Sequence, residues 1–169
     1  MAKKILSIDL ETLDTTRTAV ILEIGITVGD ETGKVIEQFQ IFPNVSEQIA
    51  AGRTVSGDTV LWWMKQDGVI QAEQANAKRY SVDDTRAELE SFLKQHADAQ
   101  YVLGNAPSFD CDIVADFLGH KPWNFWVERD VRTARMKVSM GERFDNKAEH
   151  SGLADSEAQF HDFVTYTRK

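Results

Sequence analysis

Three apolar segments of strand length lie within the first 42 residues and restrict the fold more than any other feature. They cover residues 5–8, 19–30 and 34–42, and a turn of sequence DETG lies between the last two. Their length, their β-branched residues and the flanking turns favour strands over helices. Strands that follow one another this closely usually pair with each other. The chain is therefore predicted to begin with an antiparallel meander.

Helical and strand patterns alternate after Pro43, which ends the third segment. Ser81 with Asp84 has the pattern of a helix-capping box, and Gly119 would end an apolar helix. The expected elements are a loop with a short helix (44–57), helices at 58–67 and from 81, a strand (99–105), and helices at 108–119 and 154–168. This order predicts an α/β fold, in which helices flank a mixed central sheet made of the meander and further strands.

Composition narrows the classes of protein that could have this organisation. A length of 169 residues without linkers or repeats predicts one domain over residues 1–169. The formal net charge of −8 disfavours a sequence-independent nucleic-acid coat, but not a nuclease whose acids bind metal. The lone Cys111 is expected as buried filler in a reducing compartment. Because no segment reads as a signal peptide or membrane span, we expect a cytoplasmic protein without membrane contact.

Asp9 and Glu11 stand at the end of the first apolar segment, two residues apart. In a strand, this spacing directs both side chains to one face. Asp9 also interrupts an apolar run that should be buried, where an unpaired carboxylate is costly. A divalent cation that prefers hard oxygen ligands, Mg²⁺ or Mn²⁺, would relieve both the burial and the repulsion. A solvated strand end is the alternative for this pair taken alone.

Asp110 follows an apolar strand that ends in Gly and Asn, and it stands at the start of a helix. Open α/β sheets place their sites at such strand ends. The alternative is an acid favoured there only by the helix dipole. Asp112 and Asp116 compete for the same role, but Asp112 would point elsewhere on a helix and Asp116 fits an exposed face.

His150 and Asp155 lie five residues apart, just before and within the last helix. On one continuous helix they would be turned roughly 140° from each other, so we expect the chain to bend at Gly152. His150 would then hang from a loop, where an imidazole with a near-neutral pKa can take a proton from a water. An exposed histidine beside a helix-capping aspartate is the alternative. The other histidines are expected on the surface: His96, His120 and His161.

Three motifs, DLET at 9–12, GNxxxFD at 104–110 and H-x4-D at 150–155, occur in this order along the chain. Together they resemble the DEDDh group of 3′–5′ exonucleases, whose fold is ribonuclease H-like (DnaQ-like). The resemblance is closest to the exonuclease VIII (RecE-type) nuclease domain described in phages and prophages. DTVLWWMKQ and ERDVRT also resemble stretches of that family, and the likeness runs from about Lys4 to about Val164.

The resemblance implies a metal-dependent 3′–5′ exonuclease that hydrolyses single-stranded nucleic acid, DNA favoured, and releases nucleoside 5′-monophosphates. Asp9 would bridge two divalent cations, Mg²⁺ or Mn²⁺, with Glu11 and Asp155 completing the shell of one. Asp110 would act on the second cation, and His150 would be the general base. The cytoplasm of a bacterial host would be the place of action.

Further side chains could contact the nucleic acid. Trp62 and Trp63 could stack on a terminal base or pack in the core, and Phe109 could line the cleft or fill the core. The basic segment 129–137 could bind phosphate or form a solvated helix face, and the segment 140–147 is expected as a loop near the site. The residues expected to bind substrate are Thr12, Leu13, Trp62, Trp63, Asn105, Phe109 and Arg132.

Other functions fit the same residues. An exoribonuclease would use the same five site residues, and no side chain announces a contact to a 2′-hydroxyl group. A catalytically silent nucleic-acid-binding module would have no reason to keep clustered acids that repel phosphate. A structural Ca²⁺ site would leave His150 without a role. The sequence does not indicate an oligomeric state.

Overall fold

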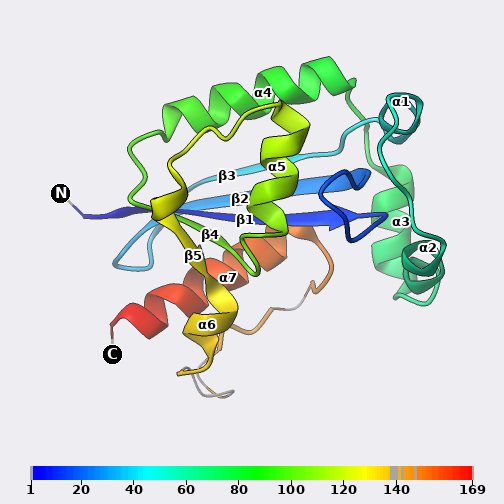
Figure 1. The fold of residues 1–169 in the computed structure, drawn as a ribbon. Coiled ribbons are helices and arrows are strands. Elements are labelled where there is room, and N and C mark those ends of the chain that lie inside the picture. The colour runs from blue at the N-terminus through cyan, green and yellow to red at the C-terminus, as the bar shows by residue number, and fades with distance from the viewer. Residues whose placement is uncertain (1, 138–140, 142, 147, 169) are drawn as a thin grey trace.

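The structure is a computed structural model that describes residues 2–137, 141, 143–146 and 148–168. Within these residues, five strands form one sheet in the order β3-β2-β1-β4-β5 (Figure 1). The strands are β1 (Lys4–Thr12), β2 (Ile21–Asp30), β3 (Val35–Ile41), β4 (Tyr101–Gly104) and β5 (Glu128–Asp130). β1, β2 and β3 pair antiparallel, whereas β4 runs parallel to β1 and β5 runs parallel to β4. The predicted meander and mixed sheet are confirmed.

Helices cover both faces of the sheet and confirm the α/β class (Figure 1). α4 and α5 pack on one face, and α7 packs on the other, with α6 against it. The helices in the described residues are α1 (Val45–Ala50), α2 (Gly57–Trp63), α3 (Gly68–Asn76), α4 (Val82–Gln95), α5 (Asp110–Leu118), the 3-10 helix η1 (Phe125–Val127), α6 (Val131–Arg135) and α7 (Gly152–Thr167). None of them is long and apolar enough to cross a membrane.

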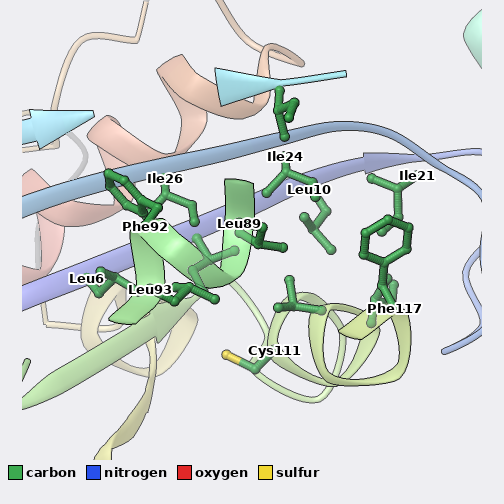
Figure 2. Packing of buried hydrophobic residues seen from close by; sticks show 14 of the residues in the cluster. Leu6, Leu10, Ile21, Ile24, Ile26, Leu89, Phe92, Leu93, Cys111 and Phe117 are labelled. Atoms are coloured by element: carbon green, nitrogen blue, oxygen red, sulfur yellow. The ribbon is translucent and has the colours of Figure 1, made fainter. Parts of the chain in front are cut away.

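The alternation of side chains along β1 divides its residues between two hydrophobic cores. Leu6 and Leu10 point to the face covered by α4 and α5, where a large apolar cluster forms (Figure 2). Ile5 points to the opposite face and packs with apolar side chains of α6 and α7. Because successive side chains of a strand alternate, Asp9 and Glu11 share the face of Ile5. The central strand therefore presents its acids towards α7.

α7 begins very close to the sheet because two glycines meet there. A Cβ atom added to Gly25 of β2 would lie 2.1 Å from the carbonyl carbon of Gly152. A Cβ atom added to Gly152 would lie 3.2 Å from the main-chain oxygen of Asp9. Glycine in a strand often marks such a close approach of another backbone. The first turn of α7 is thereby placed beside the acidic end of β1.

The helix expected at 58–67 is shorter than predicted. α2 ends at Trp63, and a separate helix, α3, begins at Gly68, where the sequence suggested a stop. Asp67 starts this second helix, because its side chain accepts the N–H of Val69 at 2.8 Å. The helix α3 was not predicted, because Gly68, which was expected to end a helix, here begins one.

β5 and α6 were not predicted as separate elements, since three residues are too few to show a strand pattern. Asp130 ends β5 and caps α6, accepting the N–H groups of Arg132 and Thr133. The capping box predicted before α4 is confirmed: the Ser81 hydroxyl accepts the N–H of Asp84 at 3.0 Å.

Some of the predictions about the burial of single residues are confirmed, and one is wrong. Cys111 is buried in the core, as predicted, and His120 is exposed. His96 is not a surface residue: it is 7% exposed, and its Nε2 lies 3.0 Å from a carboxylate oxygen of Glu37. Its ring also packs on Phe92. The burial of His96 comes from packing between α4 and β3, which a local sequence pattern does not show.

Candidate active site

Asp9 and Glu11 lie on the α7 face of β1, as their two-residue spacing predicts. Asp9 stands opposite Gly25 and accepts a hydrogen bond from the side-chain amide of Gln159 on α7. Glu11 is 7% exposed and stands opposite Glu23 of β2. Glu11 is therefore buried, and Asp9 is partly buried, on a strand that is itself central in the sheet.

Asp110 is the first residue of α5 and is almost completely buried. Its two carboxylate oxygens accept the main-chain N–H groups of Leu10, at 3.3 Å, and Ala106, at 3.4 Å. The bond to Leu10 ties the start of α5 to the segment of β1 that carries the acids. Asp112 and Asp116, the competing candidates, form ion pairs with basic side chains elsewhere.

Asp155 projects from the first turn of α7 and organises the chain before it. It accepts the main-chain N–H of His150 at 2.9 Å and a side-chain N–H of Asn146. His150 has a φ angle of 67°, in the left-handed region that residues other than glycine rarely adopt. The bend expected at Gly152 therefore occurs at His150, and Gly152 instead allows the close approach of α7 to the sheet.

The His150 ring lies beside two tryptophans of α2, both in edge-on geometry. The ring centroids are 4.9 Å from Trp62 and 6.5 Å from Trp63. Trp63 is buried, and its Nε1 donates to the main-chain oxygen of Thr12 at 2.8 Å. Trp62 is 42% exposed. Trp63 thus fixes α2 against the end of β1, while Trp62 keeps a surface open to solvent.

Side chains from distant parts of the sequence come within reach of one ion. One possible ligand atom each of Glu11, His150 and Asp155 lies within 4.8 Å of the others. Asp9 is an electrostatic neighbour of Glu11 and Asp155. Carboxylate oxygens and an imidazole at this spacing suit a divalent cation.

Burial and mutual repulsion raise the pKa values of the acids. Burial raises the pKa of Asp9 most, and the neighbouring carboxylates, Asp110 first, raise it further. Burial, followed by the charges of Asp155 and Glu23, raises the pKa of Glu11 to about 9. Burial raises the pKa of Asp110 to about 7, although main-chain N–H groups oppose the shift, and it also raises the pKa of Asp155. A cation would replace protons that this cluster otherwise holds.

Asp9, Glu11 and Asp155 line the wall of a cavity of about 660 Å³, together with other residues of α7 and of the segment before it, whereas Asp110 lies behind this wall and is not among the lining residues. A second cavity, of about 440 Å³, lies next to it and is lined by the end of β1, by α2 and by Phe109. The two cavities share Leu10 and Glu11 in their walls. The cluster of acids therefore stands where two hollows of the surface meet.

Most of the residues predicted to bind substrate lie in these cavities. Asn105 lines the larger one. Phe109 lines the smaller one and also packs against the core, so both interpretations of this residue apply. Leu13 is not among the residues that line either cavity. The predicted residues in the smaller cavity are Thr12, Trp62, Trp63 and Phe109.

Arg132 also lies outside both cavities: it is exposed and stands 3.6 Å from a carboxylate oxygen of Asp130. Arg135, from the same basic segment, lines the larger cavity instead. Its Nε donates to Asp162 at 2.6 Å, and its Nη1 donates to Asn105 at 2.9 Å. In α6, Arg135 faces the larger cavity and Arg132 does not. The sequence pattern alone could not predict which of the two arginines would line the cavity.

Residues 143–146, from the segment 140–147 predicted as a loop near the site, line the larger cavity. Phe144 donates its main-chain N–H to Asp162 and stacks on His161, which is partly buried. Residues 140, 142 and 147 lie outside the described residues.

Two residues of the site were missed by the sequence analysis. Gln159 follows Asp155 by four residues, a spacing that places both on one face of α7. Glu23 interrupts an otherwise apolar strand, where a charge needs partners. Both signals were present in the sequence, but neither residue belongs to the three motifs.

The fold is that of exonuclease I. E. coli exonuclease I in complex with a 5cy-dT13 oligonucleotide matches with a TM-score of 0.66 at 17% identity, over 100% of this chain and 42% of that one. The zinc ion bound form of its complex with single-stranded DNA gives 0.62 at 17%, over 99% and 40%. A moderately thermophilic exonuclease I from Methylocaldum szegediense gives 0.67 at 14%, over 99% and 41%. The predicted ribonuclease H-like fold is thus confirmed.

The chain belongs to the family described as the 3′–5′ exoribonuclease Rv2179c-like domain, which it matches over residues 4–166. This membership confirms the predicted superfamily. The closer resemblance to exonuclease VIII stays a prediction, because the matched family and structures carry other names. No curated protein matches the chain at a significant level. The chain spans about two fifths of the length of the exonuclease I chains.

Proposed function

We propose that this chain is a 3′–5′ exonuclease that removes nucleotides one at a time from single-stranded 3′ ends and releases nucleoside 5′-monophosphates. The observation that carries the proposal is the convergence of Glu11, His150 and Asp155 where two cavities meet, with Asp9 and Asp110 as electrostatic neighbours of Glu11 or of each other. Asp9 and Glu11 come from β1, Asp110 from α5, and His150 with Asp155 from the start of α7. Membership of an exoribonuclease family supports the same reaction class.

The donor set fits divalent cations. Glu11, Asp155 and Asp9 would hold one ion, and Asp110 would serve a second. Burial and repulsion raise the pKa values of these acids, and bound cations would stabilise their charged forms. Two bound Mg²⁺ or Mn²⁺ ions would supply positive charge for the attacking and leaving oxygens of a phosphodiester. The titration of the acids also explains why the proposed metal affinity should increase with pH.

His150 is proposed as the general base that takes a proton from the attacking water. Its main-chain N–H is held by Asp155, and its ring is bordered by Trp62 and Trp63. These contacts limit where the imidazole can point, which suits a group that must meet one water. The same imidazole is close enough to Glu11 and Asp155 to be a metal ligand instead, so the role needs a direct test.

The smaller cavity is proposed to hold the terminal nucleotide. Trp62 offers a partly exposed aromatic ring there, and Phe109 and Thr12 also line the cavity. Aromatic faces bind bases without regard to sequence. Leu13 and Arg132 have no comparable position, and Arg135 is the better candidate for a phosphate contact in the larger cavity.

RNA is a second candidate substrate. The sequence-based preference for DNA depended on the resemblance to exonuclease VIII, whereas the matched family is described as exoribonucleases. The solved exonuclease I complexes contain DNA oligonucleotides. The site residues are the same for both reactions, so the sugar has to be determined by experiment.

The test uses 5′-labelled single-stranded DNA and RNA of equal sequence, incubated with the protein and Mg²⁺, Mn²⁺ or EDTA. We expect a ladder of shortened products with either metal and none with EDTA. Oligonucleotides with a 3′-phosphate serve as the control for the direction of attack. Absence of products from both polymers at all metal concentrations would contradict the proposal and favour a silent nucleic-acid-binding module.

A further inference from the structure

Glu23 is a fully buried carboxylate that the proposed reaction does not use. It lies on β2 directly opposite Glu11, and its exposed fraction is 0%. Directly opposite residues of an antiparallel pair place their side chains on the same face of a sheet. Burying a second acid next to Glu11 is costly unless hydrogen bonds stabilise it, so its presence requires an explanation.

Three N–H donors converge on this carboxylate. Oε1 accepts the main-chain N–H of Leu153 at 3.0 Å and the side-chain amide of Gln40 at 2.9 Å. Oε2 accepts the side-chain amide of Gln74, on α3, at 2.7 Å. Glu23 therefore connects three separate elements, namely β3, α3 and the first turn of α7.

The bond to Leu153 replaces a local helix cap. The residue before α7, Ser151, makes no side-chain hydrogen bond to the first turn of the helix. Free N–H groups at a helix start need acceptors, and a negative charge there is favoured by the helix dipole. From the neighbouring strand, Glu23 supplies both an acceptor and a negative charge. It thereby fixes α7 to the sheet at the point where Gly25 and Gly152 meet.

The same turn carries the groups proposed for catalysis. Asp155 lies two residues after Leu153, and Asp155 holds His150 through its main-chain N–H. A shift of this turn would move both groups relative to Glu11 on β1. A turn fixed by Glu23 keeps the distances among these groups short enough for a shared ion.

We propose that Glu23 is a positioning residue, which sets the distance between Glu11 on β1 and the Asp155–His150 pair by capping α7 from the neighbouring strand. This inference rests on the proposed function. Groups that orient metal-binding side chains typically change metal affinity or activity by about 10–100-fold when removed. The role depends more on where the acceptor atom lies than on the charge it carries.

Two conservative variants separate placement from charge. Glu23→Gln removes the charge but keeps an acceptor for Leu153 at the same reach, and its NH2 group takes the place of Oε2, so that the Gln74 amide has to turn its oxygen towards it. Glu23→Asp keeps the charge but shortens the side chain by one methylene. We expect Glu23→Asp to weaken Mn²⁺ binding, measured by titration calorimetry, by about 10–100-fold and to lower kcat similarly. Glu23→Gln should retain most of both. Gln48→Leu is the control for loss of a buried polar side chain, since Gln48 is equally buried and, among the described residues, its side chain bonds to Ile21 of β2 and to Asn44.

The outcomes decide the inference separately from the proposed function. If Glu23→Asp kept the Mn²⁺ affinity and kcat of the wild type, or if Glu23→Gln lost as much as Glu23→Asp, the inference would be wrong. Hydrogen exchange of the Leu153 amide in the wild type tests it without any variant: slow exchange supports the cap, and exchange at unfolded rates contradicts it. A wild type that neither binds Mn²⁺ nor degrades oligonucleotides would instead contradict the proposed function.

Discussion

The candidate site combines two regions that are built in different ways. Asp9 and Glu11 lie on the central strand, and the pleat alone determines which way their side chains point. His150 lies in a turn before α7, with a left-handed main-chain conformation and contacts to α2 and Asp155. The first region is specified by local sequence, and the second depends on tertiary packing.

This difference has a consequence for how variants should behave. Asp9 and Glu11 add carboxylates to a crowded acidic cluster. Removing either one should abolish activity and also relieve the repulsion among the remaining acids. His150 contributes one proton acceptor, held by neighbours that can be changed one at a time. Substitutions in the two regions should therefore be separable by measuring stability, metal binding and activity together.

The largest effect is expected from Asp9→Asn, which tests the strand region. Activity should fall by more than about 10⁴-fold, because the proposed site then loses a carboxylate that would hold a cation. The unfolding temperature of the metal-free protein at pH 8 should not fall, since burial and neighbouring acids raise the pKa of Asp9. The exposed Asp83→Asn is the control. A normal rate in Asp9→Asn would show that the site has been misassigned.

His150→Ala tests the turn region. We expect a loss of about 10²–10⁴-fold in kcat with Mn²⁺ binding retained, as for removal of a general base. Calorimetric titration with Mn²⁺ measures the second part, and the exposed His120→Ala is the control. Loss of Mn²⁺ binding would mean that His150 is a metal ligand, which its distance to Glu11 and Asp155 permits.

Trp62 and Trp63 of α2, which border His150, are expected to have different roles around the turn region. Trp62→Ala should raise KM by an amount that corresponds to about 1–3 kcal/mol of base stacking, with little change in stability. Trp63→Ala should lower the free energy of unfolding by about 3–5 kcal/mol, because its ring is buried and its Nε1 is bonded to Thr12. Kinetics with short oligonucleotides and urea unfolding check the pair. Equal behaviour of both variants would contradict the assignment of separate roles.

The last prediction concerns stability and pH rather than activity. The pKa of Glu11 is about 9 in the folded protein against an ordinary 4.5, so the folded state holds a proton that the unfolded chain releases. The metal-free protein should therefore lose stability as pH rises from 4.5 to about 9. Glu11→Gln should weaken this dependence of stability on pH. At high pH, each kcal/mol of destabilisation that the substitution removes should raise Tm by about 3 °C. Thermal unfolding in EDTA between pH 5 and 9 measures it, and an unchanged slope would refute the shift.

The sequence predicted most of what depends on local periodicity. The meander, the capping box before α4 and the shared face of Asp9 and Glu11 each follow from residue spacing and turn chemistry. The helix α3 was missed because Gly68 can equally end or begin a helix. β5 was missed because it has too few residues to show a pattern.

The site residues that belong to sequence motifs could be predicted from the sequence. The positions that depend on tertiary packing could not. The positions of Asp110 and Asp155 follow from their places at helix starts. The bend at His150, in contrast, reflects its bonds to Asp155 and its packing on Trp62, and no local pattern indicates a left-handed histidine. The choice of Arg135 over Arg132 likewise depends on how α6 is turned against α7.

The facing glycines at the start of α7 mean that a single methyl group could separate the two halves of this site. An alanine at position 25 would need space already taken by the main chain of Gly152, so the last helix would have to move outward. Asp155 and His150 would travel with it, while Asp9 and Glu11 would stay with the sheet. The chain could thus lose its chemistry with every reactive side chain still in place, through a change in a residue that has no side chain at all.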